Sequence, residues 1–278
     1  MVVTLLSWIV ILFLAVSLGN VFLYLVAPDS LTDISSPDLI IAAGLLCLNV
    51  YAQGYSIFSN IGKEAFGLIF VIGIFCAFFW TIRIRPARKT RTRLTHDGWK
   101  WGIFVFIVSF LGLYTLKAPN NADTYLYHAQ AIRWIEEYGV VPGLGNLHNR
   151  FAYNSAFMPL QALFSFSWLF EQPLHSMNGF LGCFLVCYGA ITNKLFTKFD
   201  SRLSDFLKLV IILYVYVNRN NLSSPGTDLS AMLVLLYIFC KWSEGIERKE
   251  KNIQFFGIIC LIAVWGATLK LSTITSLL

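Results

Sequence analysis

A polar and aromatic segment at residues 117–155 carries most of the side chains suited to acid–base chemistry, among them Asp123 and His128. A regular helix that began at Asp123 would place four side chains on one face: Asp123, Tyr127, Gln130 and Trp134. His128 would then point well away from that face. An Asp–His catalytic pair within one helix is therefore not expected, unless Asp123 precedes the helix.

Five residues have a structural interpretation beside a chemical one. Asp123 suits a helix N-cap, and capping of the helix that follows is the favoured interpretation of Asp228. His128 is better explained as a packed or interfacial side chain than as an acid–base group. Arg150 suits either a phosphate or lipid headgroups. Lys270 can extend to the interface from a helix end, although an ionisable group at membrane depth is a functional candidate.

The sequence gives little sign of a metal site. Its six cysteines lie in apolar stretches without a CxxC pair or a Cys/His ligand spacing, so neither a zinc site nor a disulfide framework is expected. The other candidate ligands have no recognisable spacing: Asp123, His128, Glu136 and Glu137. A tightly bound metal is therefore not expected, and Glu136 and Glu137 are interpreted as a solvated face.

The composition is that of a membrane protein. Of 278 residues, 57% are hydrophobic and only 13% are charged, whereas a soluble domain carries about 25% charged residues. Mean hydropathy is +0.66. The net charge is +6, but the positive side chains are concentrated in a few short loops, which indicates membrane topology rather than nucleic-acid binding.

Apolar blocks of roughly 15 to 25 residues divide the chain, the length that crosses a ~30 Å hydrocarbon layer as a helix. Backbone groups in lipid must be hydrogen-bonded within their own segment, so the predicted fold is an all-α polytopic transmembrane bundle. The blocks lie at about 2–26, 39–58, 64–82, 101–116, 176–196, 206–217, 229–242 and 253–269. The first lacks a basic region and a cleavage site, so we predict a retained helix rather than a signal peptide.

Basic loops set the predicted orientation, because cytoplasmic loops are enriched in lysine and arginine. Three loops are placed in the cytoplasm: 83–100, 194–208 and 241–251. Residues 117–155 then form a long outward loop, and residues 218–228 a short one on the same face. The apolar run 157–170 must lie in the interface, or dip in and return. Three N-terminal spans would place Met1 outside, and the acidic loop inside: Asp29, Asp33 and Asp38.

Two regions are distinguished along the chain. Residues 1–98 hold N-terminal transmembrane helices and the basic cytoplasmic loop, and residues 99–278 hold the remaining spans with the outward loop 117–155. The last residues are still apolar, which we interpret as a sign that the chain is truncated at its C-terminus.

Three motifs carry a resemblance to a known class of enzymes: 123–128 (DTYLYH), 140–148 (VVPGLGNLH) and 150–155 (RFAYNS). With these motifs, residues 101–278 resemble an uncharacterised bacterial subfamily of the GT-C membrane glycosyltransferases, and the helices before them look like an N-terminal addition. The class is similar in placing an acidic residue in the first long outward loop, followed by amphipathic juxtamembrane helices. The chain would be an N-terminal portion of such a protein.

The resemblance implies an inverting enzyme of a bacterial inner (plasma) membrane. It would transfer a sugar from a polyprenyl-phosphate donor in the outer leaflet to an envelope glycan or lipid acceptor. By the same resemblance, Asp123 would be the general base that deprotonates the acceptor hydroxyl. No cofactor is required for this reaction, although some members of the class use a divalent metal.

The leaving phosphate develops negative charge, so cations should lie nearby, and the outward candidates are Arg150, Arg219 and Lys270. Histidines would donate hydrogen bonds to phosphate or sugar, and aromatic rings would stack on sugar faces. The other residues of the candidate substrate-binding set are Tyr127, His128, His148, Asn154 and Asp228.

Two other functions stay open for this chain. A transporter or flippase of lipid-linked saccharides should carry polar groups at mid-membrane on broken helices. Here the polar groups cluster in outward loops, which favours the enzyme. The third alternative is an inactive membrane assembly protein.

Overall fold

Every regular element that the structure describes is a helix. The computed structural model describes residues 1–28, 36–84, 98–195 and 202–277, and no strand forms among them. The predicted all-α fold class is therefore confirmed. Several residues used in the topology prediction lie outside the described residues, namely Asp29, Asp33, Lys198 and the basic residues between 85 and 97.

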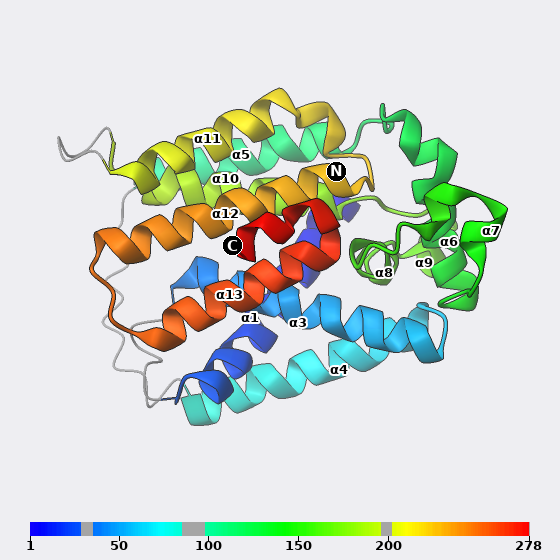
Figure 1. The fold of residues 1–278 in the computed structure, drawn as a ribbon, viewed down its shortest axis with the longest axis horizontal. Helices are drawn as coiled ribbons and strands as arrows, with labels where there is room; N and C mark the ends of the chain where they lie inside the picture. Colours follow the sequence, from blue (N-terminus) through cyan, green and yellow to red (C-terminus); the bar gives the residue numbers. More distant parts are fainter. Residues whose placement is uncertain (29–35, 85–97, 196–201, 278) are drawn as a thin grey trace.

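The described residues form eight long helices, each at one of the predicted apolar blocks (Figure 1). They are α1 (Val2–Val26), α3 (Pro37–Phe58), α4 (Lys63–Phe79), α5 (Gly98–Thr115), α10 (Met177–Thr192), α11 (Leu203–Val217), α12 (Thr227–Glu247) and α13 (Ile253–Leu269). Helix α4 continues as the π-helix η2 (Trp80–Ile84). Five of these segments are long and apolar enough to cross a membrane: α1, α3, α4 with η2, α5 and α12. Helices α10, α11 and α13 have 16, 15 and 17 residues and are shorter than those five.

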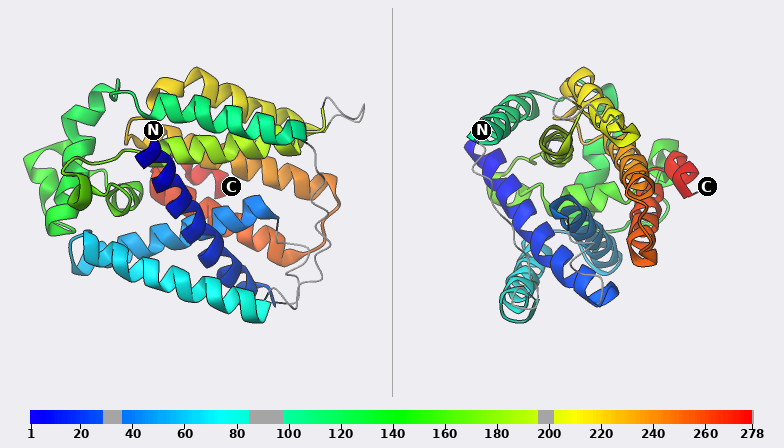
Figure 2. Two further views of the ribbon diagram at one scale, coloured as in Figure 1. Left: turned by 180° about the vertical axis from the view of Figure 1, so that it is seen from behind. Right: turned by 90° about the vertical axis from the view of Figure 1, so that its left-hand side faces the viewer.

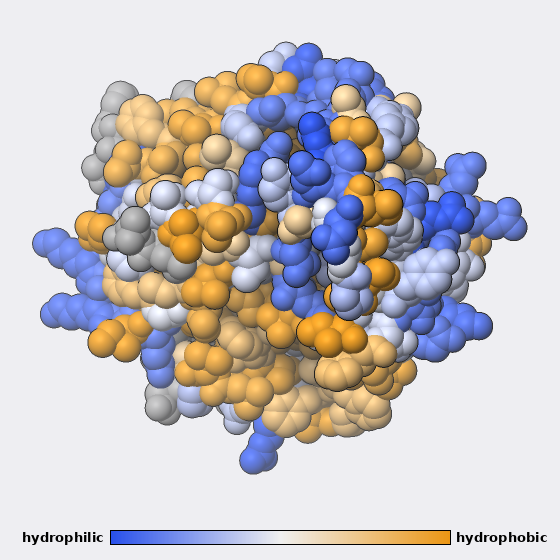
Figure 3. All heavy atoms as spheres, turned by 45° about the vertical axis from the view of Figure 1, so that its right-hand side comes forward, coloured by the Kyte–Doolittle hydropathy of each residue, from blue (hydrophilic) through white to orange (hydrophobic). Residues whose placement is uncertain are grey.

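Much of the outer surface is apolar. Helix α4 lies at the edge of the bundle, with Phe75 and Phe78 exposed (Figures 1 and 2). Broad apolar areas also cover the face shown in Figure 3. This apolar surface is larger than a soluble protein exposes to water, and it suits contact with lipid acyl chains. The chain is accordingly a membrane protein.

Helices α1 and α3 pack backbone to backbone. A Cβ atom added to Gly44 would collide with the carbonyl group of Ala15, and one added to Gly19 with that of Ile40. Small residues at a helix crossing permit this approach, as is common between membrane helices. The N-terminal helices also join the rest of the bundle, because the Trp8 indole N–H donates to the carbonyl of Ser176 (3.1 Å).

Successive helices run in opposite directions, so their connections gather at two ends of the bundle (Figure 1). We call the end that holds residues 59–62, 116–156 and 218–226 the aromatic end. The opposite end, which holds residues 193–195 and 248–252, is called the basic end. The predicted outward loops therefore share one end of the molecule. Which end faces outward stays a prediction.

Cysteine labelling checks that orientation. Asn149→Cys places a thiol at the aromatic end and should react with a membrane-impermeant maleimide on intact cells. Lys251→Cys places one at the basic end and should react only after the membrane is permeabilised. The unsubstituted chain, which has six cysteines of its own, gives the background level of labelling. Labelling of Lys251→Cys on intact cells would show that the predicted orientation is inverted.

The loop 117–155 folds back onto the bundle through helix α6 (Ala129–Tyr138). The backbone N–H of Ile61 donates to the carbonyl of Ile135 (3.0 Å), and the N–H of Val140 donates to that of Ser56 (2.8 Å). Gly139 ends the helix at φ 74°, where a Cβ atom would lie 2.7 Å from the Ser56 carbonyl oxygen. Only glycine fits this conformation and contact. The loop is thus docked on the α3–α4 connection.

Most of the remaining short helices also lie at the aromatic end (Figure 1). They are η3 (Thr124–His128), α7 (Leu144–Leu147), η4 (Asn149–Ala152), α8 (Phe157–Leu163), α9 (Ser167–Phe170) and η5 (Arg219–Asn221). The last helix, η6 (Leu271–Leu277), instead turns back from the end of α13 toward the middle of the bundle. Helix α8 is fully buried, and the chain returns after α9 with the N–H of Leu174 donating to the carbonyl of Ser165 (2.7 Å). The run 157–170 therefore forms two short helices instead of one span. Its placement in the interface, or its dipping in and returning, stays a prediction.

The connection from α9 to α10 holds a pH-sensitive histidine. Burial lowers the pKa of His175 to about 4, and its Nδ1 has no hydrogen-bond partner in the described part of the chain. The unfolded chain, with a histidine pKa near 6.5, binds more protons between pH 6.5 and 4, so folding stability should fall as pH falls through this window. The loss is at most about 3 kcal/mol.

Thermal unfolding of the detergent-solubilised protein at several pH values measures this effect. His175→Gln should reduce the dependence between pH 6.5 and 4, and leave the contribution of His128, whose pKa is also lowered by burial. His148→Gln, at an exposed histidine, should keep the original slope. An unchanged slope in His175→Gln would show that this histidine does not carry the effect.

Candidate functional site

The first turn of the aromatic-end loop differs from a regular helix. Residues Thr124–His128 form the π-helix η3, which leads directly into α6. The extra residue in a π-turn shifts the side chains that follow, so the face predicted from Asp123 is displaced; such turns are frequent at functional sites. Asp123 makes no capping hydrogen bond through its side chain, and its own N–H donates to Oδ1 of Asn121 (3.0 Å). The capping interpretation of Asp123 is wrong.

The Asp123 carboxylate instead forms an ion pair with the guanidinium of Arg150. The two side chains are 38% and 41% exposed, so the pair lies at the rim of the protein rather than in bulk water. Arg150 belongs to the 3₁₀ helix η4, where its backbone N–H donates to Nδ1 of His148 (3.2 Å). Its guanidinium lies 5.4 Å from the centroid of the Tyr127 ring, a cation–π contact.

A second carboxylate–cation pair joins Asp228, in the first turn of α12, to Lys270 at the end of α13. The favoured capping interpretation of Asp228 is therefore wrong, because its carboxylate binds a lysine distant in sequence. The end of α13 is tied to the loop that carries Arg150. The Ser155 hydroxyl donates to the carbonyl of Leu269 (2.6 Å), and the N–H of Ala156 donates to that of Thr268 (3.0 Å).

His128 is buried near both pairs. It is 4% exposed, its ring centroid lies 4.0 Å from that of Tyr127, and its Nδ1 has no hydrogen-bond partner among the described residues. Burial lowers the pKa of His128, and the carboxylates of Asp123 and Asp228 oppose that shift. The imidazole is therefore neutral at pH 7 and can both donate and accept a hydrogen bond. The packed histidine expected from the sequence is found, next to the charged groups.

Residues that the sequence analysis missed hold the two halves of the site together. The hydroxyls of Thr124 and Ser224 are hydrogen-bonded (2.8 Å). Nδ2 of the buried Asn178 donates to the carbonyls of Ser224 and Gly226 (2.7 Å each). Buried polar groups must be paired, so these bonds fix the turn before α12 against η3. In the sequence, the signal for this arrangement was an asparagine, Asn178, at the start of an apolar helix.

Three of the predicted site residues lie outside this cluster. Arg219 packs over the rings of Tyr114 and Tyr216, 5.5 and 4.7 Å from their centroids, and donates to the Tyr216 carbonyl (2.8 Å). Nδ1 of His148 accepts a hydrogen bond from the backbone N–H of Arg150. Asn154 is exposed, with its backbone N–H bonded to the carbonyl of Ala152 (2.9 Å). The structure thus brings together Asp123, Tyr127, His128, Arg150, Asp228 and Lys270.

The two glutamates of α6 differ from each other. Glu137 is exposed and pairs with Arg133 (2.7 Å), as a solvated face requires. Glu136 is partly buried, which raises the pKa of its carboxyl, and its Oε1 has no hydrogen-bond partner within the described ranges. The solvated interpretation of Glu136 is wrong because α6 rotates it toward the bundle. The described residues contain no group of three His, Cys, Asp or Glu side chains arranged to hold a metal ion.

Charged side chains are also buried at the basic end. Lys241 and Lys208, which the topology prediction assigned to cytoplasmic loops, lie within α12 and α11 and are 2% and 4% exposed. Both pair with Glu244, and Lys241 also pairs with Asp38. Counting basic residues in the sequence indicates that these lysines lie near one end of a membrane helix, but it does not tell whether their side chains face water. The expectation that polar groups cluster in outward loops is therefore wrong for these helices.

The entire chain matches one protein family. Residues 1–278 match the family described as Domain of unknown function (DUF8201), and the chain belongs to that family. No curated protein and no solved structure matches the chain.

Proposed function

We propose that this member of the DUF8201 family is a membrane glycosyltransferase of the GT-C type. It transfers a sugar from a polyprenyl-phosphate donor to an envelope glycan or lipid acceptor, on the outer face of a bacterial inner membrane that it crosses several times. The observation that carries the proposal is the rim position of Asp123, which is partly desolvated and paired with Arg150. A second cation and a neutral imidazole lie in the same cluster.

The side chains of this cluster supply the groups that the transfer reaction needs. The acceptor hydroxyl oxygen attacks the anomeric carbon as the bond from that carbon to the phosphate oxygen breaks. The hydroxyl proton passes to Asp123. The electron pair of the broken bond leaves on the phosphate, which departs as polyprenyl phosphate. Attack from the side opposite the phosphate inverts the anomeric configuration.

The cations of the cluster suit the leaving phosphate. Arg150 offers a planar fork of donors that matches a phosphate, and Lys270 offers a compact positive charge. Each is held by a carboxylate of the protein. A bound phosphate would compete for Arg150 and leave the Asp123 carboxylate available to the acceptor hydroxyl. Fixed charges aimed at developing charge are a large source of rate enhancement.

A transporter or flippase of lipid-linked saccharides is the second candidate. Buried ionisable groups within membrane helices are functional candidates by default, and Lys208, Lys241 and Glu244 are such groups. They lie near one end of the bundle, whereas alternating-access carriers bind their cargo near mid-membrane. For this reason the enzyme is preferred. An inactive assembly protein is the third alternative.

Comparing cells with and without the gene tests the proposal. Without it, an envelope glycan or lipid should lack a sugar, and the lipid-linked form of that sugar should accumulate in the outer leaflet. Returning the gene should restore both profiles. Accumulation in the inner leaflet would favour the flippase, and identical glycan and lipid-linked sugar profiles would remove both candidates.

A further inference from the structure

The lysine and arginine side chains at the aromatic end fall into two groups. Four of them form ion pairs with carboxylates: Lys63 with Glu64, Arg133 with Glu137, Arg150 with Asp123, and Lys270 with Asp228. The other two are Lys117 and Arg219, whose charged groups contact tyrosines instead of carboxylates among the described residues.

Lys117 and Arg219 lie around the same tyrosine ring. Nζ of Lys117 lies 3.9 Å from the centroid of the Tyr114 ring, and the guanidinium of Arg219 lies 5.5 Å from it. A cation–π contact positions a cation, but the ring carries no net charge that would neutralise it. Nη1 of Arg219 donates to the Tyr216 carbonyl (2.8 Å), which engages only part of the five N–H groups of a guanidinium. Two positive charges with spare hydrogen-bond donors therefore lie near each other.

Both cations directly follow the end of a long apolar helix. Lys117 comes just after α5, which ends at Thr115, and Arg219 comes just after α11, which ends at Val217. Helix η5, which holds Arg219, packs against α5, and both α5 and α11 pack on α10 (Figure 1). Tyrosines and basic side chains at helix ends are typical of the level of the lipid headgroups.

Apolar side chains near the ends of these two helices are exposed. Leu113 and Leu116 precede Lys117, and Leu213 and Val217 precede Arg219, with exposed fractions between 44% and 70%. Exposed leucine and valine on a membrane helix suit contact with acyl chains. The chain thus presents cations at the headgroup level and apolar surface on the membrane side of them.

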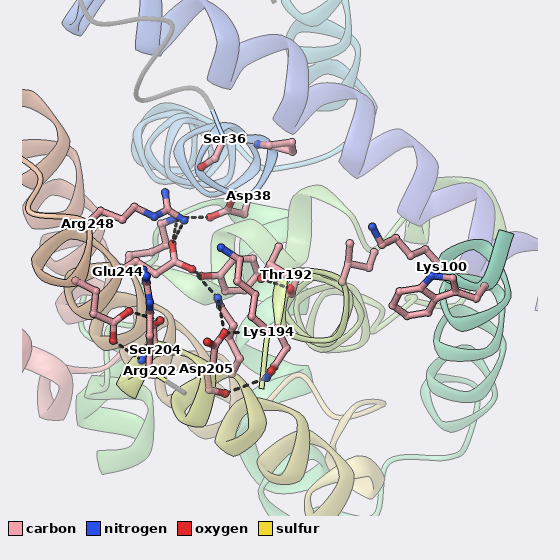
Figure 4. A pocket seen from close by; sticks show the side chains of 18 residues that line it. Ser36, Asp38, Lys100, Thr192, Lys194, Arg202, Ser204, Asp205, Glu244 and Arg248 are labelled. Carbon is pink, nitrogen blue, oxygen red and sulfur yellow. Dashed lines mark hydrogen bonds and ion pairs between the residues drawn. The ribbon is translucent and has the colours of Figure 1, made fainter. Parts of the chain in front are cut away.

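The cations at the basic end are held differently. A cavity of about 600 Å³ lies there beside a buried network of charges from α3, α11 and α12 (Figure 4). In this network, Nζ of Lys208 lies 2.9 Å from Glu244, and Nζ of Lys241 lies 2.9 Å from both Asp38 and Glu244. The other cations that line the cavity also have interaction partners within the protein. The positive charge of that cavity therefore does not indicate a ligand.

We propose that Lys117 and Arg219 bind the headgroup phosphate of an anionic phospholipid at the aromatic end, with its acyl chains on the apolar surface of α5 and α11. A phosphate accepts charge-assisted hydrogen bonds from a lysine and an arginine at once. Two cations without a carboxylate partner favour a lipid of net negative charge over a zwitterionic one. The exposed apolar side chains next to the cations favour a lipid over a soluble phosphate. The site lies outside the cluster around Asp123 and does not depend on the transfer reaction proposed there.

Thermal unfolding of the purified protein in a neutral detergent tests this site. The probe is short-chain phosphatidylglycerol in mixed micelles, and the comparisons are short-chain phosphatidylcholine and inorganic phosphate. At constant ionic strength, phosphatidylglycerol should raise the unfolding midpoint by roughly 3 °C, and each comparison should raise it by less than about 1 °C. An equal rise with phosphatidylcholine would contradict selection by charge. An equal rise with inorganic phosphate would show that a soluble anion, not a lipid, occupies the site.

Double variants separate the site from general charge effects, with each rise measured against the lipid-free midpoint of the same variant. Lys117→Gln with Arg219→Gln should reduce the rise to less than about 1 °C. Lys63→Gln with Arg133→Gln removes two other cations of the aromatic end, whose side chains are 72% and 69% exposed, and should keep the rise.

A charge-preserving variant separates the loss of charge from the loss of packing on Tyr114. Lys117→Arg with Arg219→Lys exchanges the two side chains and should keep most of the rise. The proposal fails if phosphatidylglycerol does not raise the midpoint of the original protein. It also fails if the rise is equal in the two double variants that carry glutamine.

Discussion

Asp123→Asn should reduce sugar transfer by a factor of about 10² to 10⁴, the usual contribution of a general base. The amide has the size of the carboxylate but cannot take up the proton of the acceptor hydroxyl. Folding should change little, because the Asp123–Arg150 pair is partly exposed and such pairs stabilise by about 1 kcal/mol or less. The measurement is transfer of labelled sugar from a polyprenyl-phosphate donor in membrane vesicles.

Glu137→Gln is the matched control for this substitution. It makes the same chemical change on the same loop, at an exposed carboxylate that pairs with Arg133 four residues earlier. This variant should transfer sugar at the original rate. If Asp123→Asn transfers sugar as fast as Glu137→Gln does, Asp123 has no part in the mechanism.

The same variant distinguishes the enzyme from the flippase. In a flippase, Asp123→Asn would leave sugar transfer in vesicles intact, and lipid-linked intermediates would accumulate on the cytoplasmic side of cells. In the enzyme, the flipped donor would accumulate on the outer side. Leaflet-specific labelling of the lipid-linked sugar reads the difference directly.

Secondary structure was predictable from the sequence because it depends on local properties. A run of apolar residues long enough to enter a membrane must form a helix, whatever surrounds it. All eight apolar blocks are helical, and the interrupted run 157–170 is not a single span. Less predictable was the π-turn at Thr124–His128. It depends on how the loop docks, and no local signal of composition or spacing distinguishes it from a regular helical turn.

The composition of the candidate site was predictable, but its pairing was not. Asp123 and Arg150 are 27 positions apart, and Asp228 and Lys270 are 42 positions apart. Rules based on neighbouring residues assign an aspartate at a helix start to capping, because they do not include a partner from another helix. Tertiary contacts between α13 and the Arg150 loop decide these pairs.

The buried network at the basic end was missed for a related reason. Lysines near a membrane helix end predict a cytoplasmic loop, and they do lie toward the end where the basic loops were expected. Burial depends on carboxylates from other helices, such as Asp38 of α3, which is about 200 positions from Lys241. Such distant pairing has no signature in a single sequence.

Lys241→Met should destabilise the protein by about 3–5 kcal/mol, because it leaves a carboxylate buried without its cation. Glu244 would keep Lys208 as a partner, but among the described residues Asp38 would keep only the Tyr237 hydroxyl. Methionine has a similar length, so lost packing contributes little. Thermal unfolding in detergent should show a midpoint lower by roughly 10 °C.

Two comparisons show whether this loss comes from the uncompensated charge. Lys63→Met removes an exposed lysine that lies 3.9 Å from Glu64, and should cost less than about 1 kcal/mol. Adding Asp38→Asn to Lys241→Met removes the stranded charge and should restore at least half of the lost stability, since neutral groups are far cheaper to bury than ions. Independent, additive losses in the double variant would mean that the two side chains are not coupled. In that case the network would not join α3 to α12 energetically.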